Sequence, residues 1–274
     1  MAERAQVMGV LNVTPDSFSD GGRFLDPDAA VAHGLAMAAE GADVVDVGGE
    51  STRPGAEPIG AVEECRRVVP VIHELARHVR VSIDTRHAVV AEAAVAAGAT
   101  LVNDVSSSLG RLTAALGPGI GFVAMHMQGD PRTMQDDPSY DDVVDDVTRF
   151  LVERAEDAAA AGVTEVWIDP GIGFGKTAAH NLALLAHLDR LAASGFPVVV
   201  GTSRKRFLGA LAAEADGLPP GEMAPTDDRL EGSIATAVWA MWHGARMIRA
   251  HDVRATVLAA EAVVGAIDER SPGT

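Results

Sequence analysis

The stretch Val198-Val199-Val200-Gly201-Thr202-Ser203-Arg204-Lys205-Arg206-Phe207-Leu208 holds the pattern that decides the fold. Its continuous apolar run, without polar alternation, is typical of a parallel strand buried on both faces. The run ends in a Gly/Thr/Ser turn, and a cluster of three cations then opens a segment with helical periodicity over 204–213. The stretch therefore predicts a strand followed by a helix, with polar groups gathered between them.

The same alternation recurs along the whole chain. Eight apolar runs of strand length are predicted strands: Val7–Leu11, Val44–Val47, Val81–Ile83, Leu101–Val102, Phe122–Met125, Val166–Ile168, Val198–Val200 and Met247–Ile248. Amphipathic, Ala-rich helices are expected near 27–40, 61–78, 87–97, 110–117, 140–161, 178–194, 204–213 with 227–243, and 253–267. Such alternation indicates a parallel sheet, either open or closed.

Proline and glycine mark the predicted helix boundaries. Asp26-Pro27 and Ser139 are expected helix starts, because Asp and Ser accept hydrogen bonds at the N-cap and proline is tolerated in the first turn. Glycine just after a helix permits the left-handed turn that ends it. Five helices are expected to end in this way, at Gly41, Gly98, Gly162, Gly195 and Gly244.

The placement of polar residues favours closure of the sheet into a barrel. Polar groups follow all eight predicted strands: Asn12, Asp46, Asp84, Asn103, His126, Asp169, the turn 201–205, and Arg249 with His251. A barrel collects its active site from many strand ends, whereas an open doubly wound sheet concentrates ligands at one crevice. We therefore expect one α/β domain over 1–274, a TIM (β/α)8 barrel, with a surface insertion at 213–226 and a flexible tail at 268–274.

The composition is that of a globular protein and argues against several kinds of partner. The chain has 274 residues, is 47% hydrophobic and carries a formal net charge of −17. No window approaches the ~18 consecutive apolar residues of a membrane-spanning helix, and a strand that starts near Gln6 leaves no room for a signal peptide. A nucleic-acid partner would call for a basic face. We expect a cytoplasmic protein with no nucleic-acid and no membrane partner, which holds any anionic substrate by a local cluster of cations.

Lysine is confined to two positions, Lys176 and Lys205, among 22 Lys and Arg residues. An ammonium is a compact, rotatable donor whose pKa can shift, whereas a guanidinium is a planar fork. A specific task could therefore hold lysine at either position, and chance is the alternative. Lys205 lies in a strand-end turn. Lys176 follows Phe174 in a glycine-rich turn without the spacing of a phosphate-binding P-loop, and we expect no catalytic role for it.

Three strand-end residues, Asp84, Asn103 and Asp169, suggest a pocket for a flat heterocycle. Carboxylates accept paired hydrogen bonds from amidine-like N–H groups, so the set suits a ring that carries an amino group beside a ring N–H. Each residue alone has an ordinary alternative as a turn or cap residue. Three in register at strand ends favour the pocket.

A second set of residues suggests an anion site. Arg53, Arg249 and His251, with Asn12 opposite, are expected to hold a phosphate group. The alternative is that Arg249 and His251 pair with nearby carboxylates for stability. No cluster in the sequence resembles a zinc or iron site.

Eight ordered motifs, together spanning essentially the whole chain, resemble those of the dihydropteroate synthases. The segments 8–22 (MGVLNVTPDSFSDGG) and 46–55 (DVGGESTRPG) resemble the first two signatures of that family. The others follow in family order at 82–85 (SIDT), 103–106 (NDVS), 125–129 (MHMQG), 169–174 (DPGIGF), 203–205 (SRK) and 249–252 (RAHD). Eight motifs in order are far more specific than any one of them.

The resemblance implies a reaction and a set of roles. Members of the family join 6-hydroxymethyl-7,8-dihydropterin diphosphate to 4-aminobenzoate, release diphosphate and form dihydropteroate. By resemblance, Asp84, Asn103, Asp169 and Lys205 would hold the dihydropterin. Asn12 would ligate the Mg²⁺ that accompanies the diphosphate, with Arg53, Arg249 and His251 on its oxygens. Thr52, Pro54, Phe174 and Lys205 would line the aminobenzoate site. A homodimer is also expected, with Trp239 and Trp242 as interface candidates or, equally, as core residues.

The chain departs from the family pattern at Ser106-Ser107-Ser108, where a Gly-rich turn is usual beside the pterin pocket. Arg206 also stands where some relatives have serine. Two other functions stay open at this point. A non-catalytic pterin-binding paralogue would show erosion of residues such as Asn12 or Lys205, and none is eroded. A methyltetrahydrofolate-type methyltransferase would have a different loop set.

Overall fold

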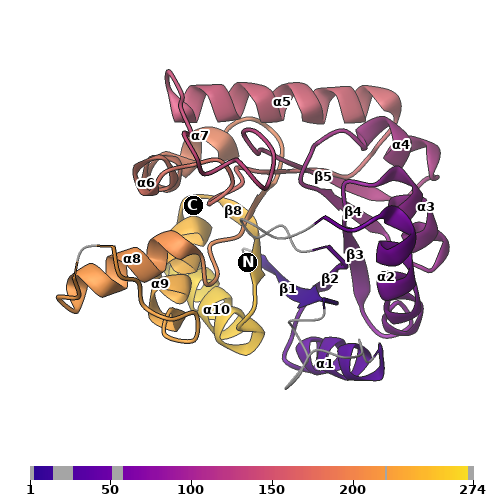
Figure 1. Cartoon of the computed structure of the whole chain (residues 1–274), viewed down its shortest axis with the longest axis horizontal. Helices are drawn as coiled ribbons and strands as arrows, with labels where there is room; N and C mark the ends of the chain where they lie inside the picture. Colours follow the sequence, from indigo (N-terminus) through magenta and orange to yellow (C-terminus); the bar gives the residue numbers. More distant parts are fainter. Residues whose placement is uncertain (1–2, 15–26, 51–57, 220, 271–274) are drawn as a thin grey trace.

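Eight parallel strands form a closed barrel, in the order β1-β2-β3-β4-β5-β6-β7-β8, inside a ring of helices (Figure 1). A computed structural model describes residues 3–14, 27–50, 58–219 and 221–270 of the chain. Every strand pairs in parallel with its neighbours, and β1 pairs with both β2 and β8, which closes the sheet. The chain is therefore a TIM barrel, as the alternation of strands and helices predicted.

The eight strands coincide with the eight predicted apolar runs and extend some of them by a few residues. They are β1 Gln6–Asn12, β2 Val44–Gly48, β3 Arg80–Asp84, β4 Leu101–Asp104, β5 Gly121–Met125, β6 Val166–Asp169, β7 Val198–Val200 and β8 Ala245–Ala250. The helices are α1 Pro27–Ala39, α2 Ala61–Leu75, α3 Ala88–Ala96, α4 Gly110–Ala115, α5 Val143–Ala161, α6 Ala178–Ala186, α7 Leu188–Ala192, α8 Arg206–Ala215, α9 Leu230–Trp242 and α10 Val253–Arg270.

An apolar layer fills the lower part of the barrel and determines which residues face inward above it. This layer comprises Met8, Val44, Leu101, Val123, Trp167, Val199 and Met247. Side chains alternate along a strand, so the residue two positions further on faces the same side. Asp46, Asn103, Asp169 and Arg249 stand two positions after members of the layer and so point into the barrel above it. A larger apolar core lies between the strands and the helices.

Glycine ends the helices as predicted, but one predicted helix start was wrong. Gly41, Gly98, Gly162, Gly195 and Gly244 all have φ between 92° and 115°, which is the left-handed conformation expected after a helix. The N-cap of α5 is Asp142 rather than Ser139, and its carboxylate accepts hydrogen bonds from the backbone N–H groups of Val144 and Asp145. Pro27 opens α1 as predicted, while Asp26 lies outside the described residues.

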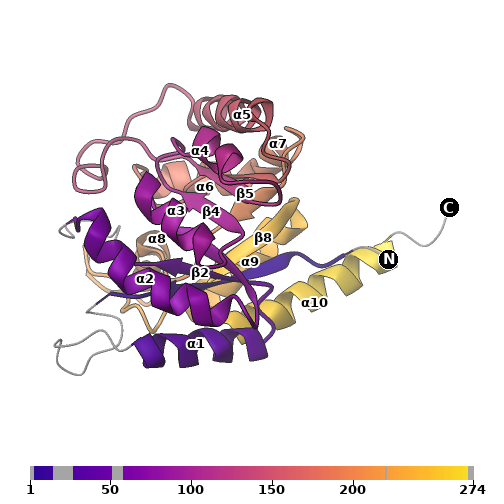
Figure 2. The same cartoon turned by 90° about the vertical axis from the view of Figure 1, so that its right-hand side faces the viewer.

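The loops at the carboxyl ends of the strands lie opposite the end of the barrel where α10 finishes (Figure 2). The predicted helix over 178–194 is divided into α6 and α7 at His187. The helix α10 continues to Arg270, into the segment 268–274 that was expected to be a tail. None of the helices in the described ranges is long and apolar enough to cross a membrane.

Candidate active site

A cavity of about 1070 Å³ opens at the carboxyl ends of the strands. Six of the predicted site residues line it: Asn12, Asp84, Phe174, Lys205, Arg249 and His251. They come from β1, β3, β8 and the segments after β6, β7 and β8, so closure of the barrel brings together residues up to 239 positions apart. Three other predicted site residues, Thr52, Arg53 and Pro54, lie outside the described residues.

Arg249 is the centre of a buried ionic network. Its Nε donates to Asp46 Oδ2 at 2.7 Å, and its Nη2 donates to Asp84 Oδ2 at 2.8 Å. The two carboxylates raise the pKa of Arg249 against the effect of burial. Burial raises the pKa of Asp84 to about 7, and Asp46 adds to this effect while Arg249 opposes it. Pairing with carboxylates, the alternative considered for Arg249, is therefore present, and three of its five N–H groups remain for a ligand.

Asp46 was missed as a site residue although it lies within the predicted strand Val44–Val47 and was noted among the polar groups of the strand ends. Its Oδ2 accepts both from Arg249 and from Asn103 Nδ2, the latter at 3.0 Å. Asn103 is thereby fixed beside Asp84, with which it shares a register position between β3 and β4. The sequence contained a signal for this role, because Asp46 stands within the otherwise apolar run Val44–Val47. In the structure, all residues of this strand are buried. A buried carboxylate of this kind calls for a cationic or amide partner.

Asp169 and Lys205 interact through their charges. Asp169 is buried, and its Oδ1 accepts from the Gly171 N–H at 2.7 Å. Burial raises the pKa of Asp169, while this hydrogen bond and the charge of Lys205 oppose the shift. Burial likewise lowers the pKa of Lys205 to about 8, with Arg249 adding to the effect and Asp169 opposing it. A bound ligand that contacts Asp169 and Lys205 would therefore replace the water that both groups lost on burial.

Lys205 also contacts an aromatic face. Its Nζ lies 4.0 Å from the centre of the Phe174 ring, within the range of a cation–π interaction. Lys205 is the N-cap residue of α8, whereas Phe174 belongs to the segment after β6. Together they form one wall of the cavity, charged at one end and apolar at the other.

The imidazole of His251 is held by Ser203. The Ser203 hydroxyl oxygen accepts from the His251 backbone N–H at 3.1 Å and also lies 3.1 Å from His251 Nδ1. Burial lowers the pKa of His251 to about 3, and Arg249 and Arg204 add to this effect. An Nδ1 atom that accepts the hydroxyl proton of Ser203 leaves the proton of the neutral ring on Nε2. His251 thus offers one neutral N–H donor rather than a charge.

A small oxygen-lined space lies between β1, β2 and β3. A Cβ atom added at Gly48 would lie 3.7 Å from both Asn12 Oδ1 and Asp84 Oδ2. Glycine therefore keeps open a space between an amide oxygen and a carboxylate oxygen, and hard oxygen ligands suit Mg²⁺. The residues present fit the predicted ion, which would bind through Asn12 and mainly through ligand phosphate.

Lys176 was assigned no role from the sequence, yet it lines the cavity and is only 2% exposed. The two lysines of the chain therefore face the same space. Burial lowers the pKa of Lys176 to about 7. Its neighbour His126 is also buried, and burial together with Lys176 lowers the pKa of that imidazole to about 3.

The unusual serine turn is held by hydrogen bonds rather than by glycine. Ser107 has a φ of 54°, in the left-handed region that favours glycine. Asp104 accepts from the backbone N–H groups of Ser106, Ser108 and Leu109. The Ser107 hydroxyl donates to the carbonyl of Met125 at 2.7 Å. Side-chain hydrogen bonds thus fix the turn where the family pattern has glycine.

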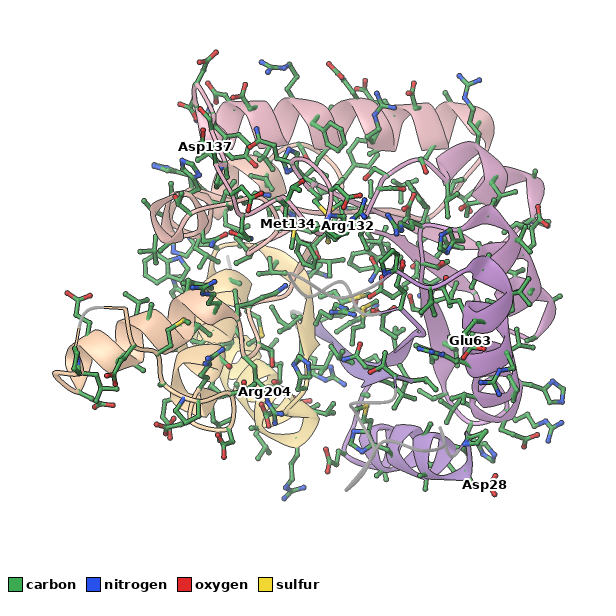
Figure 3. The ribbon with its side chains drawn as sticks, viewed as in Figure 1. Asp28, Glu63, Arg132, Met134, Asp137 and Arg204 are labelled. Atoms are coloured by element: carbon green, nitrogen blue, oxygen red, sulfur yellow. The ribbon has the colours of Figure 1, made fainter. Side chains whose placement is uncertain are left out.

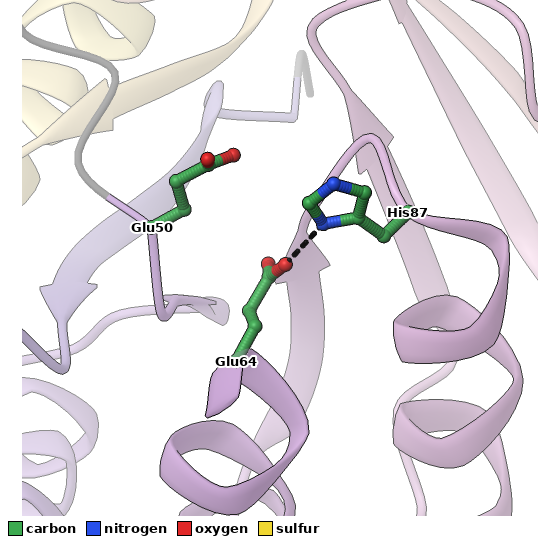
Figure 4. A group of neighbouring side chains, drawn as sticks. All are labelled: Glu50, Glu64 and His87. Carbon is green, nitrogen blue, oxygen red and sulfur yellow. Dashed lines mark hydrogen bonds and ion pairs between the residues drawn. The ribbon is translucent and has the colours of Figure 1, made fainter. Parts of the chain in front are cut away.

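The structure brings together one further group that sequence spacing did not reveal. Side-chain oxygen or nitrogen atoms of Glu50, Glu64 and His87 lie within 4.8 Å of one another (Figure 4). Each carboxylate already has a basic partner, because Arg86 donates twice to Glu50 and His87 Nδ1 lies 2.7 Å from Glu64. The group therefore consists of two neighbouring polar contacts, Arg86 with Glu50 and His87 with Glu64, near the start of the segment after β2.

Two segments far apart in sequence form the rim of the cavity. Met134, from the segment after β5, and Arg204, from the turn after β7, both line it (Figure 3). Arg204 has a φ of 59° and pairs with Asp252, its Nη2 lying 2.6 Å from Asp252 Oδ1. The segment 213–226, expected to be a surface insertion, contributes residues such as Leu218 and Met223 to the lining. This segment is thus part of the site wall.

The chemistry that this cavity supports follows from its charges. Acceptors for an N–H-rich ring lie deep in the barrel, cationic and neutral N–H donors lie near Arg249 and His251, and an apolar wall flanks Lys205. Such preorganised groups can stabilise charge that develops when a bond to an anionic leaving group breaks. The described lining of the cavity includes a hydroxyl–imidazole pair, Ser203 with His251 Nδ1 at 3.1 Å, in which the hydroxyl oxygen also accepts from the His251 backbone N–H.

Comparisons with known proteins agree with this geometry. The family described as pterin binding enzyme matches residues 8–251. The dihydropteroate synthase of Mycobacterium leprae is 51% identical over 270 residues, which cover 95% of this chain and 93% of that protein. A structure of the Xanthomonas albilineans dihydropteroate synthase with 4-aminobenzoic acid is 47% identical, with a TM-score of 0.86, and covers 97% of this chain and 94% of that one. A structure from the same organism in complex with 7,8-dihydropteroate is 44% identical, with a TM-score of 0.82 and the same coverage.

Proposed function

We infer the roles of the site residues from the premise that the chain belongs to the pterin-binding enzyme family and catalyses the dihydropteroate synthase reaction. In this reaction, 6-hydroxymethyl-7,8-dihydropterin diphosphate condenses with 4-aminobenzoate to give 7,8-dihydropteroate and diphosphate. The observation that carries the assignment of roles is the convergence of Asp84, Arg249, Lys205 and Phe174 on one cavity.

The deep acceptors bind the dihydropterin. Asp169 and Asp84 accept hydrogen bonds from its amino group and ring N–H groups, and Asn103, held by Asp46, completes the polar floor. Lys205 donates to the oxygen or nitrogen acceptors of the ring. The opposite charges of Asp169 and Lys205 stabilise each other, so the pocket is already charged and oriented before the substrate arrives.

The diphosphate lies near Arg249 and His251. Arg249 keeps its contacts with Asp46 and Asp84 and donates its remaining N–H groups to phosphate oxygens, while His251 donates from Nε2. Arg53, predicted for the same role, lies outside the described residues. Asn12 would hold Mg²⁺, which would supply positive charge to offset that of the diphosphate. Because the chain as a whole is acidic, these local donors are what makes the site receptive to an anion.

The 4-aminobenzoate lies between Phe174 and Lys205, with Thr52 and Pro54 as its predicted further neighbours. The aromatic ring of the substrate packs on Phe174, and Lys205 attracts its carboxylate or its π-face. This arrangement directs the amine nitrogen toward the methylene carbon of the dihydropterin.

The reaction requires no covalent bond to the protein. The bond between the methylene carbon and the diphosphate oxygen breaks, and its electron pair leaves with diphosphate. The resulting cation is delocalised over the dihydropterin and opposed by the Asp84 carboxylate. The amine nitrogen then forms a bond to the methylene carbon and loses one proton to the released diphosphate or to water. Charge stabilisation by fixed groups is the main contribution that this chain makes.

A two-substrate assay tests these roles. We expect diphosphate release to need both substrates and Mg²⁺, and we expect Lys205→Ala to lower kcat/KM by about 10²-fold or more, as loss of a preorganised charge does. Melting temperature and circular dichroism control for the fold. If Lys205→Ala leaves both KM values and kcat unchanged, the role given to Lys205 is wrong.

We further propose that the protein is a cytoplasmic homodimer. Core packing does not account for the two tryptophans of α9, because Trp239 is 48% and Trp242 39% exposed. Trp239 stacks on His243 and donates from Nε1 to the Leu185 carbonyl of α6, and α6 presents Leu182, which is 42% exposed. An apolar face shared by two adjacent helices supports a self-association surface.

A further inference from the structure

The second lysine of the chain lies in a contact set that the reaction does not explain. Lys176 Nζ lies 2.9 Å from His126 Nδ1, 3.3 Å from the His126 carbonyl oxygen and 3.0 Å from the Phe174 carbonyl oxygen. An ammonium has three donors and no acceptor. Three acceptors around Nζ therefore match its protonated form, provided that the neutral His126 ring carries its proton on Nε2.

All three of these acceptors are uncharged, which makes the protonated form costly to keep. The charged or titratable groups around Lys176 come from several elements: Asp169 on β6, Lys205 after β7, His126 after β5, and Tyr140, whose ring centre lies 6.0 Å from Nζ. Asp169 favours the ammonium, and Lys205 disfavours it. Burial raises the pKa of the Tyr140 phenol and lowers that of His126, so both are neutral near pH 7. Burial then brings the pKa of Lys176 to about 7.

The segment that contains Lys176 is otherwise held by neutral hydrogen bonds. The segment 170–177, called here the β6 loop, receives a hydrogen bond on the Gly173 carbonyl from Gln135 and one on the Gly175 carbonyl from Tyr140, both at 2.7 Å. Its glycines pack directly on the chain that follows β5, because a Cβ at Gly171 would overlap the His126 carbonyl oxygen. The position of Phe174 thus depends on how tightly these two segments are joined.

We propose that Lys176 is a positioning residue for the arylamine, which joins the β6 loop to His126 and so holds the Phe174 ring against Lys205, and that loss of its proton loosens this connection. A neutral amine keeps two donors and presents a lone pair, so one of its three contacts is lost or requires His126 to change tautomer. The backbone at Phe174 is then held less tightly beside Lys205, by the neutral hydrogen bonds of the loop alone. The inference rests on the proposed place of Phe174 in the 4-aminobenzoate site.

Steady-state kinetics between pH 6 and 9 test the proposal on the full-length enzyme. For the wild type, we expect the KM for 4-aminobenzoate to rise severalfold with a midpoint near pH 7, beyond any change in the KM for the dihydropterin diphosphate. Lys176→Met removes all three donors and should raise the KM for 4-aminobenzoate about tenfold at pH 6, as loss of buried hydrogen bonds does. It should also abolish the rise in this KM near pH 7, called here the pH 7 limb. The arginine of Lys176→Arg cannot lose its charge, so this variant should also lack the rise in KM near pH 7. A change in KM near pH 8 that comes from Lys205 should remain.

Gln135→Met is the matched control, because it removes a neutral donor to the same loop. It should raise the KM for 4-aminobenzoate less than Lys176→Met does and keep the limb near pH 7. The proposal is overturned if the wild-type KM shows no midpoint near pH 7, or if Lys176→Arg keeps the wild-type limb. A KM for Lys176→Met within twofold of the wild type also overturns it.

Two further measurements keep the outcome clear. If a Lys176 variant melts early or does not fold, the wild-type pH profile alone decides the matter. Phe174→Leu tests the premise separately, because it should raise the KM for 4-aminobenzoate whatever Lys176 does. An unchanged KM in Phe174→Leu would count against the proposed arylamine site, whereas a raised KM there with a normal Lys176→Met would count only against the role of Lys176.

Discussion

At the scale of single residues, burial is the largest cause of the pKa shifts in the cavity. The same loss of solvation raises the pKa of Asp84 and lowers those of Lys205, Lys176 and His251. A ligand with complementary charge compensates these groups for the water that they lost on burial. The affinity for the ligand is therefore coupled to the protonation state of the groups. The residues with these shifts all line the cavity.

Asp84 should give dihydropterin binding a pH dependence. Because its pKa in the folded protein is about 7, the acceptor carboxylate forms as the pH rises, and affinity for the dihydropterin diphosphate should increase between pH 6 and 8. Asp84→Asn should abolish this increase and weaken binding by about 10²-fold, since an amide N–H would face the donors of the ring. Isothermal titration calorimetry measures both effects, with the exposed Asp157→Asn as a control.

The same residue should affect folding stability in the opposite direction. A carboxyl whose pKa rises from 3.8 to about 7 on folding binds a proton more tightly in the native state. Its contribution to stability is therefore present at low pH and is lost as the pH rises through this window. Urea unfolding of the wild type and of Asp84→Asn at pH 5 and pH 7.5 should show a smaller fall with pH in the variant. Equal falls would contradict the assigned shift.

Ser107 allows the cost of a left-handed backbone to be separated from the value of a hydrogen bond. Ser107→Ala keeps the positive φ and removes the donor to the Met125 carbonyl. Ser107→Gly removes the same donor but relieves a backbone cost of about 1 kcal/mol. We expect Ser107→Ala to be the less stable variant by about that amount in chemical unfolding. A glycine variant that is the less stable of the two would contradict this.

At the scale of elements, loop segments rather than strands determine the shape of the site. The β6 loop packs through its glycines on the segment after β5, and the segment 213–226 lines the cavity beside α8. The helices behind these segments have well-formed ends, including the Asp142 cap of α5 and the Thr177 capping box of α6. The ends of helices thus fix the segments that carry site residues.

The Asp142 cap should contribute measurably to stability. Its carboxylate accepts two backbone N–H groups at 2.9 and 3.0 Å, so Asp142→Ala should lower the free energy of unfolding by about 1 kcal/mol. Asp141→Ala, an exposed neighbour, is the matched control and should change it by less than about 0.5 kcal/mol. Thermal and urea unfolding give the comparison, and equal effects in both variants would mean that Asp142 does not act as the cap.

At the scale of the whole molecule, the catalytic end and the proposed association surface lie on different parts of the barrel. The cavity opens at the carboxyl ends of the strands, while Leu182, Trp239 and Trp242 lie on the outer helices α6 and α9 (Figure 1). Helices on the outside of a barrel can bury area between subunits without altering the strand ends. Association should therefore be separable from catalysis.

Leu182→Arg should weaken self-association and leave catalysis largely intact. A charge in an apolar interface should raise the dimer dissociation constant by about 30-fold or more. Analytical ultracentrifugation measures the effect, with Val62→Arg as control because Val62 is 85% exposed on α2, across the barrel. A wild-type protein that is monomeric at micromolar concentration would remove the proposal.

The sequence by itself determined the barrel, because the information for it is local. Eight apolar runs, the glycines between them and a polar residue after each strand specify where elements begin and end, and parallel strands with short connections close in only a few ways. The residues placed at strand ends, including Asp84, Asn103, Asp169 and Lys205, were found in this way. Tertiary structure alone decided which groups share one environment. Asp46 joins Arg249 across 203 positions, and Lys176, which lines the cavity, contacts His126. These contacts depend on burial and on the distances between side chains, and neither quantity is a property of local sequence.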